Sequence, residues 1–246
     1  MRLWCRQGGE GTAPRLVLIH GLGANADVWQ PLAEHINPRW IAMDLRGHGR
    51  SPYQAPYGYA IYAADVAELL AQDEEVVVVG HSMGGVVGMA LAAGWFGVKV
   101  RKVIAFGVRM RWAPDDVPKL HALARTPPRL FDRKEQAIER YLKVSGLYGL
   151  VDATSAMAQS GVREEGGKWR LTADPMINAA AGPELAPLVR AMQCPLRLAA
   201  GTRDSMVSPA ELGAFDPQGA TLEGAGHNAQ VEQPAQLWQF IQRELP

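Results

Sequence analysis

The sequence contains very little cysteine. Cys5 and Cys194 are its only two cysteines among 246 residues, they lie far apart, and neither shows the spacing of a metal-binding motif. This usage argues against a disulfide framework and fits a reducing compartment best. The sequence therefore predicts neither disulfide staples nor a metal site.

The chain also lacks an excess of charge of either sign. It carries 25 Lys and Arg against 25 Asp and Glu, so no basic surplus points to nucleic acid or to an anionic membrane as a partner. No apolar run approaches the roughly 20 residues of a membrane-spanning helix, and the first ten residues lack the apolar stretch of a signal peptide. We expect a soluble cytoplasmic protein. Hydrophobic residues make up 48% of the chain, which is enough for a large core.

The stretch around Ser82 organises the rest of the chain. Residues 76–79 are four consecutive valines, which is typical of a short strand buried on both faces of a parallel sheet. This strand ends at GHSMGG, residues 80–85, and residues 86–95 have the composition of a helix. A serine flanked by glycines between a strand and a helix matches the nucleophile elbow G-x-S-x-G. The alternative is a glycine-rich turn that carries an ordinary serine.

Short apolar runs and helical spacing predict the remaining elements. Strands are expected at residues 2–7, 16–20, 40–44, 100–106, 196–200 and 220–223, and helices at 27–36, 61–70 and 233–245. Strands that alternate with helices predict an α/β fold with a mostly parallel central sheet flanked by helices.

The alternation of strands and helices stops near residue 110 and resumes near residue 188. The intervening stretch is predicted to be mostly helical, with a helix at 135–144 and a short extended piece at 169–171. We therefore divide the chain into a core domain, residues 1–110 and 188–246, and a helical cap, residues 111–187. The cap is inserted after the strand that follows the nucleophile helix, where it can act as a lid over the site.

A second motif competes with the elbow. Residues 21–26, GLGANA, match the dinucleotide fingerprint G-x-G-x-x-G/A, and Asp44 ends the next strand, in the place of a ribose-binding acid. Dinucleotide binding explains neither His20 before the glycines nor the elbow serine. A hydrolase accounts for all of these features and is therefore favoured.

A nucleophilic serine needs a base, and the base needs an orienting acid. Asp204 and His227 each follow a predicted strand, where the sites of open α/β sheets gather. We predict Asp204 as the acid and His227 as the base. Asp44 remains a rival acid, and Asp204 has the alternative role of capping a helix that begins near residue 208. The other histidines all precede the last strand; they are His20, His35, His48, His81 and His121, and we expect His20 and His81 to hold loops by hydrogen bonds.

Two further groups of residues complete the predicted site. The backbone N–H groups of Leu22 and Met83 are expected to form the oxyanion hole. Arg109 and Arg111 are candidates for binding a substrate carboxylate, with solvated arginines as the alternative. Trp112 and Trp169 are candidate substrate contacts in the insertion.

Five motifs of this sequence resemble those of the α/β-hydrolase superfamily over essentially the whole chain. They are HGLG at 20–23, DLRGHGRS at 44–51, GHSMGG at 80–85, GTRD at 201–204 and GAGH at 224–227. The resemblance implies a sheet of about eight strands, and the short stretch before residue 16 leaves little room for the first. It is nearest to the capped small-esterase branch of carboxylesterases, enol-lactonases and methyl-ester hydrolases. Haloalkane dehalogenases and epoxide hydrolases have Asp at the elbow, and carbon–carbon hydrolases often have Asn in place of His81.

The sequence thus predicts a serine hydrolase that cleaves a small carboxylic ester, lactone or thioester through an acyl-enzyme on Ser82. It predicts no metal and no organic cofactor, a small-molecule substrate as partner, and a monomer or homodimer. Three alternatives on the same fold stay open: a carbon–carbon bond hydrolase, a cofactor-free oxygenase or perhydrolase, and a ligand-binding receptor with little turnover.

Overall fold

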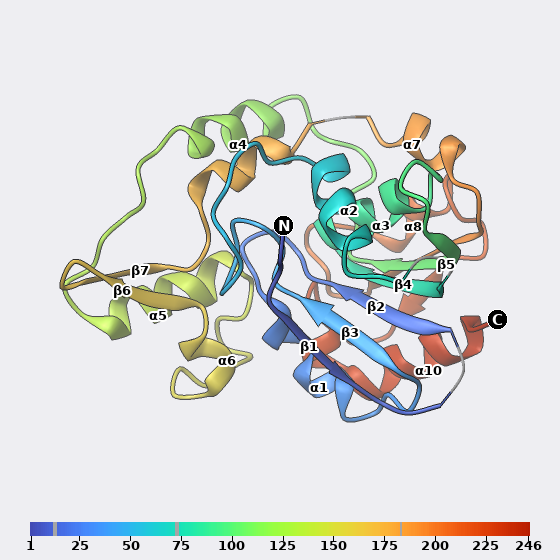
Figure 1. Cartoon of the computed structure of the whole chain (residues 1–246), viewed down its shortest axis with the longest axis horizontal. Coiled ribbons are helices and arrows are strands. Elements are labelled where there is room, and N and C mark those ends of the chain that lie inside the picture. The colour runs from blue at the N-terminus through green and yellow to red at the C-terminus, as the bar shows by residue number, and fades with distance from the viewer. Residues whose placement is uncertain (12–13, 72–73, 183) are drawn as a thin grey trace.

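A central sheet runs through the computed structural model, which describes residues 1–11, 14–71, 74–182 and 184–246 (Figure 1). Among these residues the sheet has seven strands in the order β1-β3-β2-β4-β5-β8-β9. Only β1 runs antiparallel to its neighbour, at one edge, and the other pairs are parallel. The strands are β1 (Cys5–Gly8), β2 (Arg15–Ile19), β3 (Trp40–Met43), β4 (Glu75–His81), β5 (Lys99–Phe106), β8 (Leu196–Gly201) and β9 (Ala220–Leu222). The predicted fold class is therefore confirmed.

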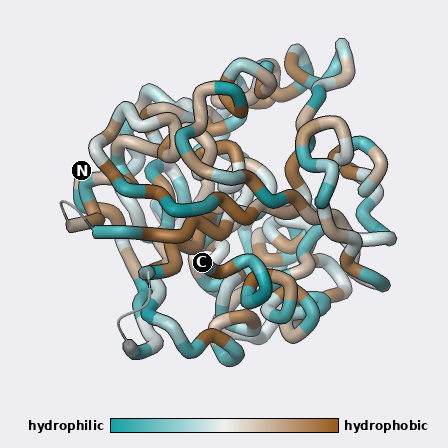
Figure 2. The backbone as a smooth tube through the Cα atoms, turned by 90° about the vertical axis from the view of Figure 1, so that its right-hand side faces the viewer, coloured by the Kyte–Doolittle hydropathy of each residue, from teal (hydrophilic) through white to brown (hydrophobic). Residues whose placement is uncertain are grey.

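The four valines of β4 explain why this strand lies at the centre of the sheet. All four are fully buried, and they alternate between two hydrophobic clusters, one on each face. Val76 and Val78 face one cluster, and Val77 and Val79 face the other. Figure 2 shows the hydrophobic strands crossing the middle of the molecule. Because β4 is apolar on both faces, it requires helices on both sides.

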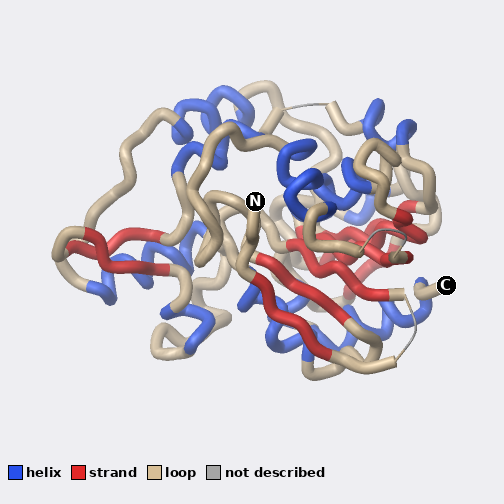
Figure 3. The backbone as a smooth tube through the Cα atoms, in the orientation of Figure 1, coloured by secondary structure: helices blue, strands red, loops and turns tan. Residues whose placement is uncertain are grey.

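Helices cover both faces of the sheet (Figures 1 and 3). The face of Val76 and Val78 packs against α2 (Tyr59–Ala67) and α3 (Met83–Leu91), and α7 (Ala186–Ala191) and α8 (Pro209–Leu212) lie on the same side. The opposite face packs against η1 (Ala26–Trp29), α1 (Gln30–Ala33), α9 (Ala229–Glu232) and α10 (Pro234–Glu244). In the part of the chain that the structure describes, no helix is both long enough and apolar enough to span a membrane.

The helix predicted at residues 27–36 is broken into two short pieces. A turn of 3-10 helix, η1, precedes one turn of α-helix, α1. Pro31 lies at the junction and has no N–H with which to bond the carbonyl of Asp27. The prediction of one helix over residues 27–36 is therefore wrong in its continuity and its length.

The middle segment consists of helices and one β-hairpin. It contains α4 (Asp116–Ala124), α5 (Lys134–Val144), α6 (Ala156–Gln159), β6 (Val162–Glu165), β7 (Lys168–Leu171) and η2 (Pro175–Ala180). The predicted helix at 135–144 is α5, and the extended piece at 169–171 is β7, which pairs with β6 away from the main sheet (Figure 3). Gly166 and Gly167 both have positive φ and form the two-residue turn that such a hairpin prefers.

Candidate active site

Ser82 lies in a strained turn between the end of β4 and the start of α3. Its φ of 50° and ψ of −118° make it the only non-glycine residue with positive φ among the described residues. A side chain at Gly84 would place Cβ 2.0 Å from the carbonyl oxygen of Ile19, and one at Gly80 would lie 2.5 Å from the Cα of Gly85. Since backbone cannot yield as a flexible side chain does, only glycine fits either position. The elbow geometry therefore follows from its sequence, as expected.

Hydrogen bonds to neighbouring backbone hold the elbow in place. The N–H of Ser82 donates to the carbonyl of Phe106, at the end of β5, over 2.9 Å. The carbonyl of Ser82 accepts from the N–H of Gly85, also over 2.9 Å. These hydrogen bonds to β5 and to the first turn of α3 hold Ser82 in its strained conformation.

Asp204 and His227 form a hydrogen-bonded pair on the loops that follow β8 and β9. The imidazole Nδ1 lies 2.9 Å from Oδ2 of the carboxylate, whose side chain is fully buried. The other oxygen, Oδ1, accepts from the N–H of Met206 at 2.8 Å and of Val207 at 3.2 Å. Burial raises the pKa of Asp204, but the hydrogen bond and charge of His227, together with the two N–H donors, outweigh it and lower this pKa.

Ser82 and His227 line the same cavity, which has a volume of about 840 Å³. The ring of His227 lies beside that of His81, the residue before Ser82, with 4.7 Å between ring centroids. Among the described residues, the Ser82 hydroxyl makes no hydrogen bond to His227. The distance between a nucleophile and its base is often longer than a hydrogen bond when no substrate is bound. The pairing of Ser82 with His227 is therefore argued from the cavity that both residues line.

The cavity also contains Leu22 and Met83, the two residues predicted to supply N–H donors. The loop after β2 approaches the elbow closely, since a Cβ at Gly21 would lie 3.3 Å from that of Ser82. Neither the N–H of Leu22 nor that of Met83 donates a hydrogen bond within the described part of the chain. Met83 is the first residue of α3, where an N–H has no acceptor inside its own helix.

His20 and His81 hold loops at the site, as predicted for both. Nδ1 of His20 donates to the carbonyl of Gly21 at 2.8 Å, and its Nε2 accepts from the N–H of Leu45 at 3.0 Å. Nε2 of His81 donates to the carbonyl of His227 at 2.9 Å. Burial lowers the pKa of His20 and, to a greater extent, that of His81. Both rings are therefore neutral supports for the backbone around the cavity.

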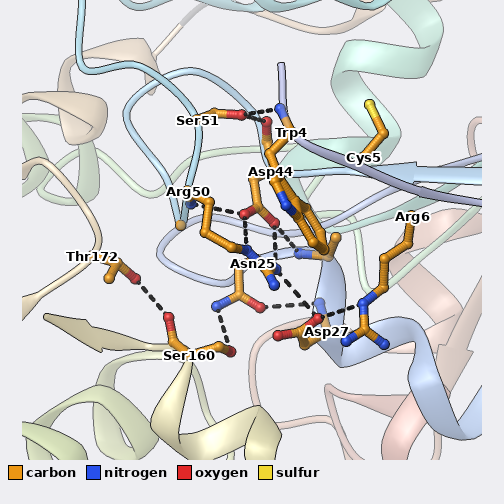
Figure 4. A network of polar contacts seen from close by, with 12 residues as sticks. Trp4, Cys5, Arg6, Asn25, Asp27, Asp44, Arg50, Ser51, Ser160 and Thr172 are labelled. Carbon is orange, nitrogen blue, oxygen red and sulfur yellow. Dashed lines mark hydrogen bonds and ion pairs between the residues drawn. The ribbon is translucent and has the colours of Figure 1, made fainter.

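Asp44, the rival acid, has different partners. Its carboxylate accepts from the N–H of Ala26 at 2.7 Å, and from the backbone N–H and the Nε of Arg50, each at 2.8 Å. Figure 4 shows these contacts within a network that continues through Asn25 to Ser160 of the middle segment. Asp44 is fully buried and its acceptors are already used, which leaves neither a histidine to orient nor a ribose to bind. This arrangement argues against both rival roles.

The four candidate substrate contacts fall into two groups. Arg109 and Trp112 line the cavity, but the guanidinium of Arg109 pairs with the carboxylate of Asp116 in α4. Arg111 is exposed and packs over the ring of Phe215, and Trp169 packs in the β-hairpin. Arg111 and Trp169 therefore lie outside the cavity wall, and Arg109 reaches it with its charge already paired.

Asn228, which follows His227 directly, is a residue at the site that the sequence did not predict. Its side-chain amide donates to the carbonyls of Ser145 and Gly146, both at 3.1 Å, where α5 ends. A polar residue beside the last histidine was visible in the sequence, but its partners lie more than 80 positions away. No cluster of three or more His, Cys, Asp or Glu side chains suited to a metal occurs in the described ranges.

A comparison with known proteins assigns the family. The profile of the alpha/beta hydrolase family matches residues 16–240, which is most of the chain. The chain therefore belongs to the alpha/beta hydrolase family, whose members are hydrolases with this fold.

Individual relatives support the same assignment. The chain is 30% identical over 214 residues to 2-(acetamidomethylene)succinate hydrolase of Mesorhizobium japonicum, which covers 82% of this chain and 76% of that protein. It is 46% identical over 91 residues to Lipase LipV of Mycobacterium tuberculosis, but this match covers 36% of this chain and only 34% of the lipase. A crystal structure of E-2-(acetamidomethylene)succinate hydrolase superimposes with a TM-score of 0.79 at 26% identity, over 98% of this chain and 94% of that one.

Proposed function

We propose that the protein is a serine hydrolase that cleaves a carboxylic ester through an acyl-enzyme on Ser82. One observation carries the proposal: a strained serine at the start of a helix opens onto the same cavity as a histidine paired with a buried aspartate. The name of the lipase relative supports an ester as the bond cleaved, over the third of its length that matches. Lactones and thioesters undergo the same acyl transfer and fall within the proposal.

In the first half-reaction, Nε2 of His227 takes the proton of the Ser82 hydroxyl as its oxygen attacks the ester carbonyl. The tetrahedral intermediate places negative charge on the former carbonyl oxygen. The N–H groups of Leu22 and Met83 are free to donate to it. Each such donor typically contributes about 2.7–4 kcal/mol of transition-state stabilisation.

The first half-reaction is complete when the protonated His227 gives its proton to the leaving alkoxide and the carbonyl reforms as the acyl-enzyme. In the second half-reaction, water attacks the acyl group with His227 as the base. His227 then returns the proton to the Ser82 oxygen as the carboxylic acid leaves. Asp204 remains ionised throughout because its pKa lies below the ordinary value. Its negative charge holds Nδ1–H and stabilises the imidazolium that forms in each step.

The proposal predicts that Ser82 alone reacts with a fluorophosphonate. Intact-mass measurement should show one adduct on the wild-type protein, and peptide mapping should place it on Ser82. Ser82→Ala should lose the adduct and lower kcat for p-nitrophenyl esters by roughly 10⁴- to 10⁶-fold, because the nucleophile is gone.

Ser205 supplies the matched control, since it also lines the cavity but lies outside any elbow. Ser205→Ala should label and turn over like the wild type. Near-normal turnover by Ser82→Ala would contradict the acyl-enzyme and favour chemistry that uses the His227–Asp204 pair alone.

A further inference from the structure

The cavity has an unbalanced charge. Seven of its lining residues in the described part of the chain are Lys or Arg, and two are Asp. The whole chain, by contrast, has equal numbers of basic and acidic residues. The surplus of positive charge is therefore a property of this cavity and not of the molecule.

Local carboxylates neutralise only part of this surplus. Four of the seven lining cations have a carboxylate partner: Arg109 pairs with Asp116, Lys143 with Glu139, Arg170 with Glu165, and Arg203 with Glu232. Both lining aspartates are themselves engaged, since Asp174 accepts from the hydroxyl of Tyr57. These carboxylates do not balance all of the lining cations, so the cavity wall keeps a net positive charge.

Three lining cations have no carboxylate partner within 4.0 Å among the described residues. They are Lys119 on α4, Arg129 on the loop between α4 and α5, and Arg140 on α5. All three are exposed, so they lie at the rim and not in the interior. The guanidinium of Arg129 lies over the ring of Phe131, 5.0 Å from its centroid.

Two buried donors in the cavity wall also lack a partner. They are the indole Nε1–H of Trp112 and the Nε–H of Arg170, which is only 8% exposed. A buried donor without an acceptor is costly, and native structures usually satisfy it with water or a ligand. Both donors call for acceptor oxygens, which an anionic group supplies.

The region next to Ser82 has the opposite character. Leu22, Val86 and Val108 line it, and these side chains favour an apolar acyl chain. The cavity is therefore apolar near the nucleophile and cationic at the rim made by the middle segment. A ligand that matches both parts has an apolar body and a negative end.

We propose that the substrate is an ester whose acyl part ends in a carboxylate or phosphate-type anion, which binds the rim cations Lys119, Arg129 and Arg140. This inference rests on the proposed esterase function and adds the substrate class. The unpartnered N–H groups of Trp112 and Arg170 donate to further oxygens of the same substrate. The rim cations raise the local concentration of anionic substrates and hold their charged end, while Ser82 acts on the carbonyl.

The test compares three p-nitrophenyl esters of similar length. They are p-nitrophenyl valerate, mono-p-nitrophenyl glutarate, and the p-nitrophenyl ester of 4-phosphonobutyrate. We expect a higher kcat/KM for at least one anionic ester than for valerate, and the preference should shrink as salt rises from 20 to 500 mM because salt screens exposed charges. The better of the two anionic esters identifies the anion as carboxylate or phosphonate.

The variant pair Lys119→Gln/Arg140→Gln removes two rim charges. It should raise KM for the preferred anionic ester with kcat nearly unchanged, and so lower kcat/KM roughly five- to thirtyfold, as expected for two exposed ion pairs. Hydrolysis of the valerate ester should not change. The control Arg125→Gln/Arg133→Gln removes two charges at the ends of the same helices, outside the cavity, and should behave as wild type.

Calorimetry with Ser82→Ala separates failure of this inference from failure of the esterase proposal. Glutarate and butylphosphonate are titrated, with valeramide as the uncharged ligand. Anion binding that is lost in the rim variant supports the rim site even if no ester is cleaved. Turnover of all three esters without preference, or an equal effect of the rim and control variants, would overturn the inference and leave the esterase standing.

Discussion

Two buried aspartates near the strand ends differ in what they hold. Asp204 contacts an imidazole and two backbone N–H groups, and it lies beside the cavity. Asp44 holds Arg50 and the N–H of Ala26, the first residue of η1. Both aspartates follow a strand of the central sheet, so only their partners distinguish an acid that orients a base from one that holds backbone and an arginine in place.

The pair Asp204→Asn and Asp44→Asn tests this difference. Asp204→Asn should lower kcat by about 10⁴-fold, because an amide cannot stabilise the imidazolium, with a small effect on unfolding. Asp44→Asn should lower the free energy of unfolding by about 1.5–3 kcal/mol, because it weakens charge-assisted hydrogen bonds. Steady-state kinetics and urea denaturation measure both. The assignment is wrong if the two variants exchange these effects.

At the scale of elements, α5 and the loop of His227 are joined through one side chain. Asn228 is 1% exposed and donates to the carbonyls of Ser145 and Gly146, the two residues that follow α5. The helix also ends with the N–H of Leu147 donating to the carbonyl of Leu142 at 2.8 Å, as in a Schellman motif. The position of the middle segment over the cavity and the position of His227 are therefore linked.

Replacing Asn228 should affect both ends of this link. Asn228→Ala leaves two buried carbonyls short of a donor and should cost about 1–3 kcal/mol of stability. We expect faster hydrogen exchange at residues 145–151 together with a lower kcat/KM. Ser155→Ala is the control, because the Ser155 hydroxyl caps α6 by accepting from the N–H of Ala158; this variant should speed exchange in α6 only. Faster exchange without any change in kinetics would show that the link does not reach the site.

At the scale of the whole molecule, three histidines are buried near the carboxyl ends of the central strands. His20, His48 and His81 are each at most 3% exposed, and burial lowers the pKa of all three. Below pH 6.5 the unfolded chain binds protons at these positions that the folded protein does not. Their contribution to stability is therefore complete above pH 6.5 and declines as the pH falls.

This linkage predicts acid sensitivity well above the range in which carboxylates titrate. The free energy of unfolding should fall between pH 6.5 and 5.5 by up to about 1 kcal/mol for each of the three histidines. Urea denaturation at intervals of half a pH unit measures the slope. His35→Gln, at an exposed turn, should leave the slope unchanged. A flat profile across this range would mean that the three rings take up protons without unfolding.

Much of the core followed from the sequence because its signals are local. A run of valines is buried on both sides wherever it lies in a sheet, and the elbow glycines tolerate no side chain. The parallel sheet, the turn at Ser82 and the loop positions of Asp204 and His227 were all predicted from such short stretches. The hairpin of β6 and β7 had a local signal as well, in Gly166 and Gly167, and was predicted only in part.

The sequence by itself determined the order of strands and helices, the turn that carries Ser82, and the family. Only the tertiary structure decided that Asp44 binds Arg50, that Arg109 is paired with Asp116, and that Asn228 meets α5. The same holds for the cations that reach the cavity rim. The physical reason is range: backbone conformation depends on neighbouring residues, whereas the partner of a buried charge depends on which distant segments the folded sheet brings together.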